Sequence, residues 1–200
     1  MSERYIKGTV DISGFYVTEL PEFFNGLVIR GGFFCGDNQL KTLKNTPAEV
    51  TGTFSCKDNK LISLEGIPSI IGGSVDIRYN KLPSLKHSPS RVTGEFDCRY
   101  NMLKNLDFGP TIIEPNKDSI VDAYYLCSYN SLVTLRGAPE MVDGSFHCDN
   151  NLLRDLSGAP KEVTKDFICY NQRAQPGYDP VKFTEEQVRA VCKVGGRVYV

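Results

Sequence analysis

The stretch Val50–Ile70 reads VTGTFSCKDNKLISLEGIPSI, and close copies of it recur along most of the chain. The next copy, at residues 71–91, is IGGSVDIRYNKLPSLKHSPSR. Further copies begin at Val92, with VTGEFDCRYNMLKNLDFGP, and at Val142, with VDGSFHCDNNLLRDLSGAP. A repeat of this length is typical of a solenoid, in which each copy forms one turn and stacks on the next.

Aligning the copies produces columns of equivalent residues, and the unit reads V-x-G-x-F-x-C-x-x-N-x-L-x-x-L-x-x-x-P. The cysteine column contains Cys35, Cys56, Ile77, Cys98, Cys127, Cys148 and Cys169. The asparagine column contains Asn38, Asn59, Asn80, Asn101, Asn130 and Asn151. The columns extend from Ile6 to about Gln172, so nearly the whole chain follows one period.

The F-x-C segment of each copy has the alternation of a β-strand. In such a strand Phe54 and Cys56 point to one side, and Ser55 and Lys57 point to the other. One copy cannot bury its apolar side alone, so we expect the strands to stack about 4.8 Å apart in a parallel sheet. We also expect the asparagines to form a ladder that satisfies backbone groups in the turn after each strand.

With these columns, residues 6–171 resemble the leucine-rich repeat in its short bacterial form. Similar repeats occur in leucine-rich effectors of pathogenic bacteria and in uncharacterised repeat proteins of bacteria and tailed phages. The resemblance implies an α/β-type repeat solenoid of about eight 21-residue rungs. It also implies a curved shape, with a parallel β-sheet on the concave face and mostly irregular or 3-10 structure on the convex side. It implies little about function, which depends on sites placed on a fold.

We interpret the 200 residues as a single domain in three parts. Residues 6–26 form an N-terminal cap rung, and residues 27–172 form the repeats. Cys98 and Cys127 are 29 residues apart instead of 21, which predicts an eight-residue insertion, assigned to residues 112–119. Residues 173–200 form a C-terminal cap, with a capping box from Thr184, a helix over residues 185–193 and a last strand over residues 197–200.

Composition limits the classes of partner. The formal net charge of −1 gives no indication of nucleic acid or of an anionic membrane. No apolar run approaches the ~18 residues of a membrane span, and the first residues, MSERYIKG, lack a signal-peptide core. We therefore expect a cytoplasmic protein. Six of the seven cysteines lie in the inward column and none forms a C-x-x-C pair, which favours buried, reduced thiols and no metal site.

No combination of residues in the sequence indicates catalysis. His147 precedes Cys148, but neighbours on a strand point to opposite faces and cannot act as a pair. His87 lies on the return arc, where most copies have glycine. There is no glycine-rich phosphate loop and no Ser-His-Asp set. We therefore expect neither an enzyme nor a cofactor.

The outward side of the predicted sheet is the candidate site. Its middle rungs combine arginines, aspartates and tyrosines, and Tyr and Arg are the residues that dominate binding hot spots. These side chains could instead serve only the fold, because charge pairs and stacked rings are ordinary between neighbouring strands. The candidate partner-binding residues are Lys57, Asp76, Arg78, Tyr79, Asp97, Arg99, Tyr100, Tyr124, Tyr129 and His147.

The sequence predicts a non-catalytic module that binds a partner protein through its concave face. By analogy with the effector and phage repeats, that partner is a host or defence protein which the chain blocks or redirects. The alternative is nucleic-acid or nucleotide binding by Lys57, Arg78 and Arg99 with the tyrosines, which the neighbouring aspartates oppose. We expect a monomer or a weak homodimer, the latter through exposed Leu126, Ile168 and Tyr170.

Overall fold

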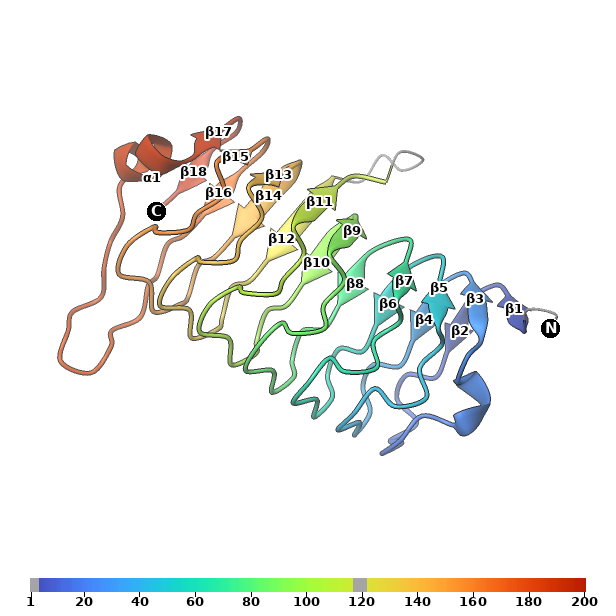
Figure 1. Ribbon diagram of the computed structural model, residues 1–200. Helices are drawn as coiled ribbons and strands as arrows, with labels where there is room; N and C mark the ends of the chain where they lie inside the picture. The colour runs from blue at the N-terminus through green and yellow to red at the C-terminus, as the bar shows by residue number, and fades with distance from the viewer. Residues whose placement is uncertain (1–3, 117–121) are drawn as a thin grey trace.

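Each turn of the chain contains two short strands that meet at a corner, followed by an irregular return arc (Figure 1). The computed structural model describes residues 4–116 and 122–200. One strand of each turn joins a nine-stranded parallel sheet, here called the main sheet. Its strands are β2 (Val10–Asp11), β4 (Phe33–Phe34), β6 (Phe54–Ser55), β8 (Val75–Asp76), β10 (Glu95–Asp97), β12 (Ala123–Leu126), β14 (Gly144–His147), β16 (Phe167–Ile168) and β18 (Val198–Tyr199).

The other strand of each turn joins one of two smaller parallel sheets that run beside the main sheet (Figure 1). The first contains β1 (Tyr5–Lys7), β3 (Val28–Arg30), β5 (Glu49–Val50) and β7 (Ile70–Ile71). The second contains β9 (Arg91–Thr93), β11 (Ile112–Glu114), β13 (Met141–Val142), β15 (Glu162–Val163) and β17 (Lys193–Val194). Phe54 lies opposite Val75, one repeat later, so the 21-residue period sets the register.

The chain is therefore a parallel β-solenoid of about eight turns. Among the described residues the helices are a 3-10 turn, η1 (Glu22–Phe24), and one α-helix, α1 (Glu185–Val191). The α/β class that we expected is not confirmed, because nearly all the regular structure is strand. No helix in residues 4–116 and 122–200 is long and apolar enough to cross a bilayer.

The core consists of the columns that the sequence predicted to point inward. The phenylalanines of the F-x-C segment, the two leucine columns and the cysteine column are buried, as are Val75 and Tyr125, which replace Phe in two turns. All seven cysteines are free and buried, which confirms that the cysteine column points inward. A cysteine side chain is small and apolar enough to fill a core position between stacked strands.

The asparagine ladder is confirmed and connects successive turns. The amide nitrogen of Asn59 donates to the carbonyl oxygens of Cys56 in its own turn (3.1 Å) and Cys35 in the preceding turn (3.0 Å). Its amide oxygen accepts from the backbone N–H of Leu40 at 2.8 Å. Gln172 continues the ladder in the last repeat, where its Nε2 donates to the carbonyls of Cys169 and Cys148. The longer side chain of Gln172 thus performs the role of asparagine.

The glycine at the corner between the two strands is required by close stacking. A Cβ added to Gly144 would lie 1.7 Å from the carbonyl oxygen of Ala123 in the preceding turn. A Cβ on Gly73 would lie 2.8 Å from the backbone of Gly52. The glycine column therefore has a structural cause that involves no ligand.

The structure corrects the position of the insertion. Residues 112–114 form β11, which pairs with β9 on one side and β13 on the other, and Ile113 is buried. The eight extra residues therefore begin at Pro115 and end at Asp122, before Ala123 pairs with Gly144. Of the predicted insertion, residues 117–119 lie outside the described residues.

The C-terminal segment covers the last turn. Thr184 and Gln187 form the predicted capping box, and Phe183 and Val188 are buried. The helix ends at Val191, two residues earlier than predicted, because Lys193 and Val194 join β15 as a further strand. The last strand is limited to Val198–Tyr199, which pairs with β16.

Candidate functional site

All ten candidate residues lie on the same side of the main sheet, here called its outer face. We define this face as the residues one and three positions before the cysteine column and one and two positions after it. In the first and last strands of the sheet, Ile12 and Val200 occupy the column position. Because the cysteines are buried, these neighbours point outward or enter the turn that follows. The solenoid thus brings together candidates that are up to 90 residues apart, from Lys57 to His147.

Three tyrosines form a continuous stack along this face. The rings of Tyr79 and Tyr100 are 4.2 Å apart and 9° from parallel, and those of Tyr100 and Tyr129 are 4.4 Å apart and 11° from parallel. Tyr79 and Tyr129 are 43% and 44% exposed. Burial, together with hydrogen bonding to Tyr79, raises the pKa of Tyr100 to about 12, so its hydroxyl is neutral at physiological pH. We call these residues the tyrosine ladder.

The ladder occupies a backbone position that does not favour tyrosine. Tyr79, Tyr100 and Tyr129 have φ values of 52°, 54° and 57°, in the left-handed region. In other turns the same position holds Asp37, Asp58, Asn150 and Asn171. Asp and Asn tolerate this conformation, whereas it costs a larger side chain about 1–2 kcal/mol. The middle turns therefore carry tyrosines at this position at a cost in stability.

A buried carboxylate holds the two arginines beside the ladder. Asp97 is fully buried, and its oxygens accept from Arg99 at 2.9 Å (Nε to Oδ1) and 2.6 Å (Nη2 to Oδ2). Nη1 of Arg78 lies 3.4 Å from Oδ2 of the same carboxylate. Asp97 was a candidate for partner contact, and its burial excludes direct contact. It instead orients Arg78 and Arg99, which are sequence neighbours of Tyr79 and Tyr100.

Two further carboxylates adjoin the arginines. Asp76 lies 3.4 Å from Nε of Arg78, and burial and repulsion from Asp97 raise the pKa of Asp76 to about 6. Burial and repulsion from Asp97 also raise the pKa of Glu95. Sequence reasoning did not select Glu95, although its place two residues before Asp97 puts it on the same side of the strand.

The remaining candidates lie at the two ends of this cluster. Lys57 pairs with Asp37, with Nζ and Oδ2 3.5 Å apart, on the N-terminal side. Tyr124 and His147 meet edge to face at 6.2 Å on the C-terminal side. Burial lowers the pKa of His147, so its imidazole is mostly neutral at physiological pH. The ten candidates therefore form one face but not one hydrogen-bonded site.

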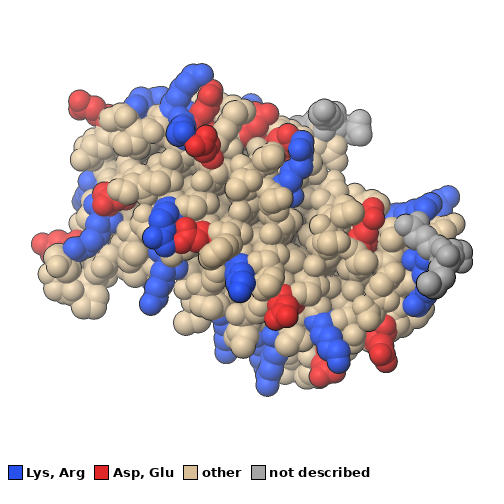
Figure 2. Space-filling model, viewed as in Figure 1, with Lys and Arg blue, Asp and Glu red and all other residues tan. Residues whose placement is uncertain are grey.

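A depression lies on the N-terminal half of the outer face. Its volume is about 610 Å³, and small side chains, among them Thr53, Ser55 and Ser74, line it. Asp76, Arg78 and Glu95 lie on its wall toward the middle turns. Seen from the side that Figure 2 shows, basic and acidic side chains are mixed over the molecule, without one large region of a single sign.

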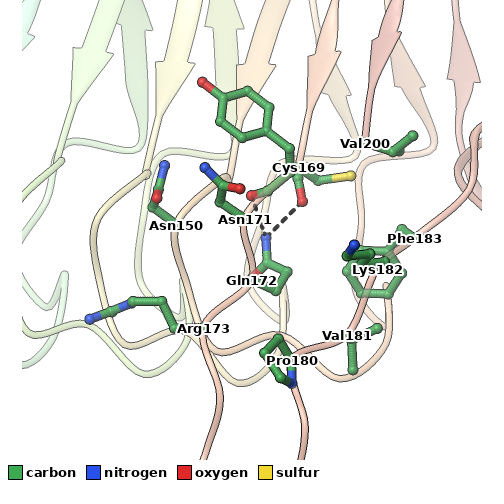
Figure 3. Close-up of a pocket in the computed structure, with 11 residues that line it drawn as sticks. Asn150, Cys169, Asn171, Gln172, Arg173, Pro180, Val181, Lys182, Phe183 and Val200 are labelled. Atoms are coloured by element: carbon green, nitrogen blue, oxygen red, sulfur yellow. Dashed lines mark hydrogen bonds between the residues drawn. The ribbon is translucent and has the colours of Figure 1, made fainter.

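A second cavity, of about 590 Å³, separates the last repeat from the C-terminal segment (Figure 3). Asn150, Gln172 and Cys169 line one side, and Val181 and Phe183 line the other. Gln172 is engaged in the asparagine ladder, as the dashed lines of Figure 3 show. Burial raises the pKa of the Cys169 thiol to about 12, so this cysteine is not a ready nucleophile.

The described residues contain no group of three or more His, Cys, Asp or Glu side chains placed to hold a metal. His147 is half-buried on the outer face and Cys148 is fully buried in the core, so the two do not form a pair. Comparison with protein-family models and with curated proteins found no match to the chain.

Proposed function

We propose that this chain is a non-catalytic module that binds a partner protein through the outer face of its main sheet. The observation that carries this proposal is the tyrosine ladder. Three stacked rings, of which those of Tyr79 and Tyr129 are exposed, occupy left-handed positions that neighbouring turns give to Asp or Asn. Residues in a backbone conformation that disfavours them are concentrated at functional sites, so we attribute these tyrosines to binding and not to folding.

Rigid aromatic rings suit this use. A tyrosine presents a large apolar surface and a polar hydroxyl, and little conformational entropy is lost when a ring that is already stacked binds. The guanidinium groups of Arg78 and Arg99 are held in place by Asp97, so their orientation is also fixed before binding. Preorganised Tyr and Arg side chains are the usual centre of a protein interface.

The nucleic-acid alternative has one observation in its favour, the presence of aromatic rings next to arginines. Two others oppose it. The rings are 4.2 and 4.4 Å apart, which leaves no room for a base between them. The arginines are already paired with carboxylates, so phosphate would have to displace Asp76 and Asp97. We therefore favour a protein partner.

We infer the class of partner protein from the resemblance of the repeat unit. The unit resembles the short bacterial leucine-rich repeat of effectors and phage proteins, which supports an inhibitor or adaptor of a host or defence protein in the cytoplasm. Seven buried cysteines without a disulfide among the described residues fit that compartment.

Site-specific crosslinking tests the proposal. A photoreactive phenylalanine analogue is placed at Tyr100 in one variant and at Phe108 in another, and each is irradiated in extract of the cells in which the protein acts. Phe108 is the control because it is an aromatic residue in the same left-handed region, with φ of 66°, and is exposed on the return arc. We expect a discrete protein adduct from position 100 alone. Adducts from position 108 alone would place the interface elsewhere.

A further inference from the structure

The outer face carries a charge different from that of the rest of the chain. Its ionisable side chains include eight carboxylates and four cations, so its formal charge is −4, whereas the whole chain has −1. The residues outside the face therefore carry +3. The carboxylates are Asp11, Asp37, Asp58, Asp76, Glu95, Asp97, Asp149 and Asp166, and the cations are Lys57, Arg78, Arg99 and Arg197.

The excess of carboxylates over cations is also present in the middle of the face. There, three carboxylates, Asp76, Glu95 and Asp97, adjoin two guanidinium groups. Arg99 pairs with Asp97, and Arg78 lies 3.4 Å from both Asp97 and Asp76. Within the described residues the carboxylate of Glu95 has no ion pair within 4 Å, and the charges of Arg99 and Arg78 only partly offset the rise in its pKa. This group of side chains is therefore one positive charge short of neutrality.

The shape of the surface admits a long side chain at this place. Glu95 and Asp76 border the depression of about 610 Å³, and its small hydroxyl-bearing residues, such as Ser55 and Ser74, leave space above the sheet. The tyrosine ladder begins one residue after Arg78. Aromatic ring faces attract cations, so a positively charged partner would also interact favourably with Tyr79.

We propose that the partner segment which docks on the outer face is basic, and that one of its lysine or arginine side chains enters the depression and pairs with Glu95 and Asp76. This rests on the proposed protein-binding function and specifies the chemistry of the partner. Complementary charge selects partners and accelerates their encounter. A nucleic acid would instead meet a face with a charge of its own sign.

Two labelled peptides, decalysine and decaglutamate, test this inference by fluorescence anisotropy at about 50 mM and about 300 mM NaCl. The variants are Glu95→Gln and, as a matched control, Glu65→Gln, which changes an exposed carboxylate on the return arc. We expect the parent to bind decalysine, with the affinity reduced about tenfold in Glu95→Gln and unchanged in Glu65→Gln. Asp76→Asn should act in the same direction as Glu95→Gln.

The inference is overturned if decaglutamate binds more tightly than decalysine, or if Glu95→Gln and Glu65→Gln weaken decalysine equally. The crosslinking experiment separates this result from the proposed function. A protein adduct at position 100 together with failure of decalysine to bind would retain the binding module and remove only its preference for a basic partner.

Discussion

Replacing Asn80 with alanine tests the link between the repeat and the stability of the fold. Its amide nitrogen donates to the carbonyls of Cys56 (3.1 Å), Ile77 (3.2 Å) and Arg78 (3.3 Å). Its amide oxygen accepts from the buried N–H of Leu61 at 2.9 Å. The substitution removes all four hydrogen bonds at once.

The loss of folding stability nevertheless comes from a single group that is left without a hydrogen-bond partner. The Cys56 carbonyl keeps the amide of Asn59, and the Ile77 carbonyl keeps the amide of Asn101. The Arg78 carbonyl keeps the backbone N–H of Asp58. Only the N–H of Leu61 loses its partner, and an unpaired buried donor costs about 1–3 kcal/mol. For a chain of this length that corresponds to a fall in melting temperature of about 2–12 °C.

Urea unfolding and thermal melting, both followed by circular dichroism, measure this effect. Lys81→Ala is the control, because Lys81 is the next residue, is exposed and contributes only its backbone N–H to the turn. Its free energy of unfolding should stay within about 0.5 kcal/mol of the parent. Equal losses at Asn80 and Lys81 would refute the ladder as the element that connects the turns.

The remaining predictions concern the core, the acidic cluster and the insertion. A thiol reagent should label at most one or two of the seven cysteines in the native protein and all seven after denaturation, and rapid native labelling of several would contradict their burial. Because the folded-state pKa of Asp76 is raised to about 6, the native state binds its proton more tightly, and stability should fall as pH rises from about 4 to about 6. Asp76→Asn should remove up to about 3 kcal/mol of that fall in urea titrations, and an unchanged pH profile would exclude Asp76 as its source. Deleting residues 115–122, which restores the 21-residue spacing between Cys98 and Cys127, should leave the melting temperature nearly unchanged, and failure to fold would make the segment part of the core.

The repeat allowed the solenoid to be predicted because each column has one physical role. Phe54 and Cys56 alternate with Ser55, so the inward side of the strand followed from a period of two. The asparagine column was recognised for the same reason. The second strand of each turn, such as Val50 in β5, was missed, because a two-residue strand has no periodicity of its own.

The candidate face was predicted more successfully than the roles of its residues. Sequence spacing placed Arg78, Arg99 and the tyrosines on one side of the sheet. It could not show that Asp97 is fully buried while its neighbour in the stack, Asp76, is partly exposed, because that depends on how long side chains fold over each other. The left-handed backbone of Tyr79 was also hidden, although Asp and Asn in the same column were a signal for it.

The burial of Asp97 changes which variants can test binding. Arg99→Ala would leave a buried carboxylate without its bidentate partner, so it would lower stability as well as binding. Tyr79→Asn avoids this problem. It loses one stacked ring, worth about 0.5–1.5 kcal/mol, and gains a residue that tolerates φ of 52°, so folding should change little.

The affinity of a captured partner for Tyr79→Asn, measured by titration calorimetry beside Phe108→Asn, tests directly whether the partner binds to the outer face. Both changes replace an exposed aromatic residue in the left-handed region with asparagine, one on the outer face and one on the return arc. We expect Tyr79→Asn to weaken binding by about 2 kcal/mol, roughly thirtyfold in Kd, and Phe108→Asn to bind like the parent. Parent-like binding by Tyr79→Asn, with loss of binding in Phe108→Asn, would contradict the assignment of function to the outer face.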